Sequence, residues 1–185
     1  MDNLIGEFFG TAVLIVFGSG VCATCSLEKS KGQGGGWICI GWGFAVTLGV
    51  YVAISLGAPQ GDLNPAVTFG KMFAGVYTFQ QFIATSIAQL LGGILGGIIV
   101  WLAYLPHWRV TKSPATKRGV FCTAPAIRNY PLNFICEFIA TFCSSASGRC
   151  LPRQTGLSCR DMVHISSASS SSLSASRSVV RQDMR

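Results

Sequence analysis

The chain has 185 residues, of which 50% are hydrophobic and 11% charged, whereas soluble domains carry about 25% charged residues. This composition favours a membrane protein over a soluble one. The formal net charge of +7 does not indicate nucleic-acid binding, because no pattern of aromatic and basic residues accompanies it. Of that charge, +4 comes from residues 144–185, where six arginines outnumber Asp161 and Asp183.

Three apolar stretches are each long enough to cross a bilayer, which takes about 20 residues. They cover residues 4–25, 37–58 and 82–105. The chain opens without the positively charged region of a signal peptide, so we expect the first stretch to be retained as a span.

Glycines four residues apart occur in the first and third stretches. This spacing lets helix backbones approach closely in lipid, where no hydrophobic force drives helices together. It therefore predicts a packed bundle rather than separate anchors. The pairs are Gly6 with Gly10, Gly92 with Gly96, and Gly93 with Gly97.

Between the second and third stretches, residues 62–66 (Asp-Leu-Asn-Pro-Ala) predict a helix start inside apolar sequence. Asn64 is a favourable N-cap residue, and Pro65 suits the first helical position, where its missing N–H has no cost. The apolar run that follows, residues 66–74, is too short to span a bilayer. A half-helix at membrane depth is tolerated where it lines a polar cavity or is buried in protein, so the motif indicates a pore or a transporter.

An internal repeat links the two ends of the apolar sequence. Residues 3–11 recur as residues 133–141, with five of nine positions identical, and this predicts two homologous halves. With three spans between the copies, the second copy starts from the opposite side of the membrane. The result is an inverted repeat, whose functional site is expected near the midplane.

Each copy of the repeat contains one acidic residue, Glu7 or Glu137, followed four residues later by threonine. An ionisable side chain in an apolar segment is energetically expensive, so a functional role is the default hypothesis. We expect both to be buried structural acceptors, with the task of orienting the non-helical loop that leads into Asn64. The alternative for Glu7 is a position near the membrane surface.

Residues 7–11, 61–68 and 137–141 together resemble the aquaporin, or major intrinsic protein, family, and most of all its bacterial glycerol uptake facilitators. The resemblance covers residues 1–142. It implies an all-α membrane protein, an aquaporin-like helical bundle with a re-entrant half-helix at about 62–74, a complete first inverted repeat and a truncated second one. It also implies a channel of the glycerol facilitator type rather than an enzyme, with passive passage of glycerol, similar small neutral solutes or water.

The resemblance further implies a multi-pass protein of the plasma membrane that needs no cofactor. Its partners would be the lipid bilayer, the small neutral solutes and, as in the intact family, further copies in a homo-tetramer. No nucleic-acid partner is expected. No metal site is expected either, since His107 and His164 are isolated. Cys22 and Cys25 have the spacing of a redox motif, which leaves a membrane-bound thiol oxidoreductase as an alternative hypothesis.

The resemblance also assigns the pore residues. Asn64, Pro65 and Ala66 match the first Asn-Pro-Ala motif of the family, and Gly61, Asp62 and Leu63 match the segment whose carbonyl groups line the inner half of the pore. Relatives usually carry histidine where this chain has Asp62. A carboxylate at this position either attracts cations or bonds locally at the turn, and the sequence leaves both alternatives open.

The selectivity aromatic has two candidates. Glycerol-conducting members use a tryptophan from the second span, which gives the carbon backbone of the solute an apolar wall. Trp42 fits the local pattern, whereas counting back from Asn64 without a gap selects Phe44. A further alternative is that Trp42 is a packing or lipid-facing aromatic.

By this resemblance the chain divides into residues 1–105 (first repeat with three spans and the half-helix), 106–131 (connector), 132–143 (partial fourth span) and 144–185. The last part has 13 serines and six arginines and no run able to cross lipid, so we expect it to be disordered or the product of a frameshift or truncation. Without the second Asn-Pro-Ala and the pore arginine of the family, we expect no normal conducting pore from this chain alone. The alternative is a non-conducting structural or interaction subunit of a channel oligomer.

Overall fold

The computed structural model describes residues 3–32, 36–125 and 127–147, with the backbone alone for 144–147. Every regular element in these ranges is a helix. Three of the helices are long and apolar enough to span a membrane, and their bounds lie within three residues of the predicted stretches. They are α1 (Asn3–Ser26), α2 (Gly36–Ser55) and α4 (Phe79–Ala103).

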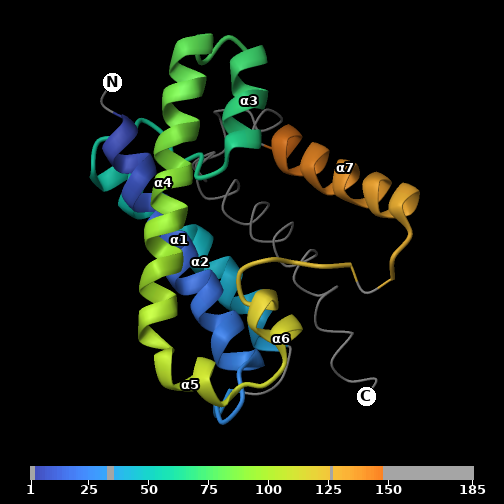
Figure 1. The fold of residues 1–185 in the computed structure, drawn as a ribbon. Helices are drawn as coiled ribbons and strands as arrows, with labels where there is room; N and C mark the ends of the chain where they lie inside the picture. Colours follow the sequence, from blue (N-terminus) through green and yellow to red (C-terminus); the bar gives the residue numbers. More distant parts are fainter. Residues whose placement is uncertain (1–2, 33–35, 126, 148–185) are drawn as a thin grey trace.

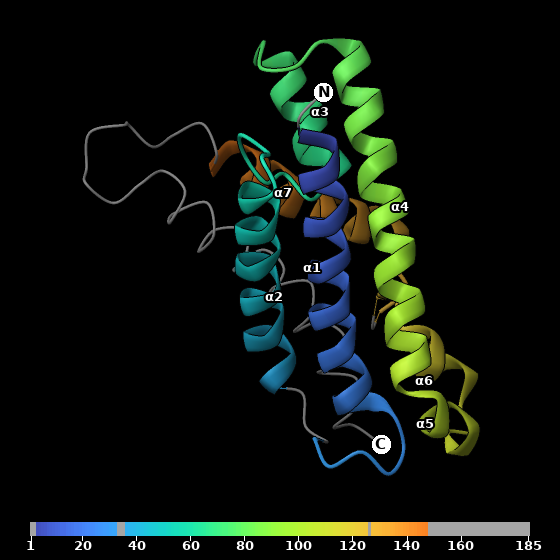
Figure 2. The same cartoon turned by 90° about the vertical axis from the view of Figure 1, so that its left-hand side faces the viewer.

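Helix α1 lies between α2 and α4 and packs against both, as Figures 1 and 2 show. The outer surface of this bundle is apolar: Leu90, Ile94 and Ile98 on α4 are 61, 61 and 50% exposed. Many of the side chains buried inside are small or polar, among them Ala12, which is 4% exposed. This reversal of the soluble pattern is expected where lipid, and not water, surrounds the helices, because small residues allow close packing there.

Close packing of α1 depends on glycines in all three spanning helices. A Cβ atom at Gly10 would lie 2.7 Å from the carbonyl oxygen of Gly49 on α2, and a Cβ atom at Gly49 would lie 2.8 Å from the carbonyl oxygen of Gly10. On the other side of α1, a Cβ atom at Gly96 would lie 2.6 Å from the carbonyl oxygen of Ala12, and Gly92 meets the carbonyl group of Phe8 in the same way. No side chain fits at these crossings.

The second glycine pair on α4 behaves differently. A Cβ atom at Gly93 would meet nothing within 4 Å, and one at Gly97 would meet only the ring of Phe121, at 3.9 Å. Of the two overlapping pairs predicted from spacing, Gly92 with Gly96 therefore forms the contact with α1.

Helix α3 (Pro65–Phe73) has nine residues and is about 13 Å long at 1.5 Å per residue, less than half of a bilayer core. It packs beside the N-terminal part of α4 (Figure 1). The turn between them contains Gly75, whose φ of 75° favours glycine, and α4 then starts with a capping box of Thr78 and Gln81.

The predicted connector is partly helical, with α5 (Leu105–Val110) and α6 (Pro114–Gly119) at the end of the bundle opposite α3 (Figure 2). Trp108 and Val120 from this segment pack with Ala23, Leu27 and Val100 in one apolar cluster. The connector thus closes this end of the α1–α4 pair.

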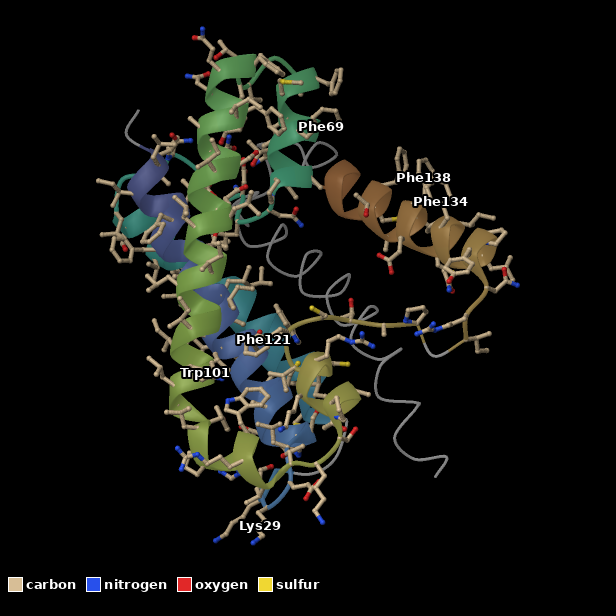
Figure 3. The ribbon with its side chains drawn as sticks, viewed as in Figure 1. Lys29, Phe69, Trp101, Phe121, Phe134 and Phe138 are labelled. Carbon is tan, nitrogen blue, oxygen red and sulfur yellow. The ribbon has the colours of Figure 1, made fainter. Side chains whose placement is uncertain are left out.

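Helix α7 (Tyr130–Ser147) contains the predicted start of the second repeat and continues four residues beyond position 143. It packs against α3, and its phenylalanines Phe134 and Phe138 lie on one face directed away from the α1–α2–α4 bundle (Figure 3). Residues 148–185 of the predicted tail lie outside the described residues.

The two overlapping glycine pairs allow a matched test of this packing. Gly92→Ala places a methyl group against the carbonyl of Phe8, so we expect it to lower the stability of the bundle by about 1–3 kcal/mol, although alanine is the better helix former. Gly93→Ala meets open space and should leave the melting temperature unchanged or raise it. Thermal unfolding of both variants in detergent micelles measures the difference, and equal melting temperatures would contradict the packing argument.

Candidate pore site

The short helix α3 begins at a capped asparagine. Asn64 has extended backbone angles (φ −151°, ψ 121°), and its side-chain oxygen accepts a hydrogen bond of 2.9 Å from the backbone N–H of Ala66. Pro65 occupies the first helical position. Asn64 and Ala66 are exposed, so the start of the helix lies at a free surface of the described structure. A helix N-terminus there presents a partial positive charge and unused N–H groups.

The loop that precedes Asn64 is held by Glu7 of α1, which is 0% exposed. One carboxylate oxygen, Oε1, accepts from the backbone N–H of Asp62 at 2.7 Å, and Oε2 accepts from the N–H of Leu63 at 2.8 Å. Oε2 also accepts from Nε2 of Gln89 on α4, at 2.9 Å. Three donors from two segments thus satisfy one buried carboxylate.

These hydrogen bonds also set the direction of two carbonyl groups. In a trans peptide the C=O of one residue points opposite to the N–H of the next. Since the N–H groups of Asp62 and Leu63 point to Glu7, and the described chain has no cis peptide bond, the C=O groups of Gly61 and Asp62 point away from it.

Leu63 has a left-handed backbone with φ 53°, which costs a residue other than glycine about 1–2 kcal/mol. Two sets of contacts hold it there. Its N–H binds Glu7, and its side chain, 6% exposed in all, fills the space left by Gly10 and Gly49, where added Cβ atoms would lie 2.7 and 2.8 Å from its methyl carbons. The glycines of the α1–α2 crossing therefore also make room for the loop.

Asp62 points its side chain to α3. Its carboxylate forms an ion pair with Nζ of Lys71, and the hydroxyl of Thr68 donates to it at 3.2 Å. The Asp62 side chain is fully buried, and that of Lys71 is 25% exposed. The sequence left two alternatives for the Asp62 carboxylate, attraction of cations or local bonding at the turn. These contacts correspond to local bonding.

Three residues of this polar cluster were not predicted: Thr68, Lys71 and Gln89. Gln89 joins the cluster by donating from Nε2 both to Glu7 and, at 3.0 Å, to Oγ1 of Thr68. A lone amide side chain in an apolar span is the signal that could have identified it, because polar groups in lipid need partners.

Trp42 and Phe44 differ in their surroundings. Trp42 packs its ring on Gly18 of α1, and its Nε1 donates to the sulfur of Cys22 at 3.3 Å. Phe44 is 67% exposed. Trp42 thus lies in the α1–α2 interface and Phe44 on the surface of α2. Cys22 and Cys25, the candidate redox pair, are free thiols in the same apolar cluster as Trp42.

Glu137 is not buried, and the expectation that it shares the environment of Glu7 is wrong for this structure. It lies exposed on α7, which packs against α3, whereas Glu7 is enclosed by α4 and the loop before Asn64. The local sequences are alike, but only Glu7 has backbone N–H groups of a re-entrant loop within reach.

The geometry defines the class of protein: a multi-pass helical membrane protein with a re-entrant, Asn-capped half-helix packed beside the spanning helix α4. Residues 1–147 match the family described as Major intrinsic protein, and the chain belongs to this family.

Similar proteins agree with this assignment. The chain is 51% identical over 142 residues to glycerol uptake facilitator protein 3 of Lactiplantibacillus plantarum, with 76% of this chain and 58% of the relative covered. It is 43% identical over 143 residues to a probable glycerol uptake facilitator protein of Thermotoga maritima, with 76% and 60% covered. The structure of the aquaglyceroporin from Plasmodium falciparum matches with a TM-score of 0.71 and 26% identity, over 94% of this chain and 69% of that one. The aquaporin-like all-α fold predicted from sequence is thereby confirmed.

The chain spans 58% and 60% of the length of these two curated relatives. Their similarity therefore identifies the family and the fold, and the activity of the whole protein is treated below as a proposal.

The repeated glutamates provide a matched pair for testing the loop anchor. Glu7→Gln replaces one acceptor oxygen by an amide NH₂ group, which would face the backbone N–H groups of the loop. We therefore expect a loss of about 1.5–3 kcal/mol in stability. Glu137→Gln changes an exposed group and should alter stability by less than about 0.5 kcal/mol. Denaturant unfolding in micelles compares the two, and an equal effect of both variants would refute the anchor role of Glu7.

Proposed function

We propose that the chain provides the first half of a channel of the glycerol facilitator type. In this proposal the assembled chain carries glycerol, similar small neutral solutes or water passively through the plasma membrane, in contrast to the expectation from the sequence that this chain alone forms no normal conducting pore. The observation that supports this most is the half-helix that begins at the capped Asn64 and packs beside the spanning helix α4. Both curated relatives described above are named as glycerol uptake facilitators.

The proposed pathway runs past Asn64. With its side-chain oxygen engaged by Ala66, the amide N–H groups of Asn64 are the donors that remain for a passing hydroxyl or water. The positive end of the α3 dipole lies at the same point and repels cations. A neutral solute with hydroxyl groups can accept from these donors, whereas a cation meets an electrostatic barrier.

The loop supplies the complementary acceptors. We assign the pore-lining role to the carbonyl groups of Gly61, Asp62 and Leu63, the first two of which point away from Glu7. A solute hydroxyl both donates and accepts, so a path with donors at Asn64 and acceptors just before it replaces the hydration that the solute loses. Trp42 and Phe44 remain the two candidates for an apolar wall opposite these groups.

In this proposal the outer surface of the bundle contacts lipid, and subunits assemble as homo-tetramers. The exposed apolar residues of α4 support the lipid contact. The names of the relatives favour a channel over a non-conducting subunit.

Asn64→Asp separates the donor role of Asn64 from its capping role. Aspartate caps a helix as well as asparagine does, but it has no N–H group and adds a negative charge. We expect the variant to keep the helix content and melting temperature of the parent chain, and its glycerol flux to fall toward that of empty liposomes. Stopped-flow light scattering of proteoliposomes in a glycerol gradient measures the flux.

Two results would refute the proposal. One is a glycerol flux for the parent chain equal to that of empty liposomes, in preparations where circular dichroism shows folded protein. The other is a flux through Asn64→Asp equal to that of the parent.

A further inference from the structure

The loop before Asn64 and the half-helix after it are joined by a network of polar side chains, called the ring below. Besides its ion pair with Asp62, Lys71 donates from Nζ to Oε1 of Gln60 at 3.0 Å. Gln60 in turn donates from Nε2 to the hydroxyl oxygen of Tyr77 at 3.0 Å, in the turn between α3 and α4. Lys71 is therefore the cation through which two loop side chains bind the last turn of α3.

The position of Asp62 makes this cation necessary. A fully buried carboxylate needs an opposite charge, because its desolvation is expensive and neutral hydroxyl groups such as that of Thr68 do not offset it. The other acidic group nearby, Glu7, has the same sign. Lys71 is the cation paired with Asp62 among the described residues.

Tyr77 adds no further negative charge to the ring. Burial, and secondly the nearby Asp62 carboxylate, raises the pKa of Tyr77 well above its usual range. Its hydroxyl group therefore stays protonated at neutral pH, and the ring contains one anion and one cation.

Glu7 and Lys71 bind Asp62 from two different helices, α1 and α3. Glu7 on α1 binds its backbone N–H, and Lys71 on α3 binds its carboxylate. Glu7 sets the direction of the peptide groups, and Lys71 sets that of the Asp62 side chain, so the two anchors together hold this residue in one conformation.

We propose that Lys71 is a positioning residue of the pore, an inference that rests on the proposed channel function. Acting through Asp62, it holds the carbonyl groups of Gly61 and Asp62 toward the solute path and keeps the Asp62 carboxylate out of it. It neutralises the Asp62 carboxylate, so that the pair of Asp62 and Lys71 carries no net charge beside the path. Removal of the lysine charge both loosens the loop and leaves an uncompensated anion beside the path.

The first test measures the loop without reference to conduction. Hydrogen–deuterium exchange of the peptide covering residues 60–66 is followed by mass spectrometry, with the full chain in lipid nanodiscs. We expect exchange about tenfold or more faster in Lys71→Met than in the parent chain. Lys71→Arg, which keeps the charge, should restore slow exchange, and so should Asp62→Asn/Lys71→Met, which removes both charges. A peptide from the middle of α4 should exchange equally in all of them.

Unchanged exchange in Lys71→Met would overturn the proposal. So would a double variant that exchanges as fast as Lys71→Met, since the effect would then not act through Asp62. If Lys71→Met does not fold while Lys71→Arg and the double variant do, the need for a charge partner is supported directly.

The second test measures selectivity in proteoliposomes, as sodium permeability relative to glycerol permeability. We expect this ratio to rise in Lys71→Met and to return to the parent value in the double variant, a change that lost packing alone would not produce. A parent chain without glycerol flux would refute the channel proposal, while the exchange experiment still decides the role of Lys71. A conducting Lys71→Met chain with the parent ratio would overturn the selectivity role.

Discussion

The structure depends on one buried carboxylate, that of Glu7. Backbone N–H groups inside a bilayer have no water to bind, so a non-helical loop at membrane depth persists only where protein groups satisfy it. Glu7 accepts hydrogen bonds from the N–H groups of Asp62 and Leu63, and Gln89 donates a third. The half-helix can therefore start at Asn64, and the strained backbone of Leu63 is held in place. Removal of this anchor would leave the backbone N–H groups of Asp62 and Leu63 without partners.

The proposed pore-lining segment, residues 61–63, is held from two sides with opposite chemistry. On the side of α1 an anion binds backbone donors, and on the side of α3 a cation binds a side-chain carboxylate. The segment itself thus exposes neither charge toward Asn64. This arrangement suits a pathway for neutral solutes, because the polar groups that remain are uncharged hydrogen-bond donors and acceptors.

Features with a local cause could be predicted from the sequence. The spans followed from hydropathy, the start of α3 from the capping preference of asparagine and proline, and the choice of Glu7 from the cost of an acid in lipid. Features that depend on the packing of distant segments could not. Gln89 reaches Glu7 across 82 positions, and nothing in the spacing of Gly92 and Gly93 distinguishes the one that touches α1. Glu137 has the local sequence of Glu7 but a different environment, since partners, and not neighbours in sequence, decide burial.

The sequence distance between Glu7 and its partners has a consequence for biosynthesis. The partners lie 55, 56 and 82 residues further along the chain. Proteins are synthesised from the N-terminus, so α1 leaves the ribosome long before Gln89 exists. In this interval the helix contains an acidic side chain with none of its final hydrogen bonds. The three hydrogen bonds of Glu7 are complete only when α4, the last of the three spanning helices, packs against α1.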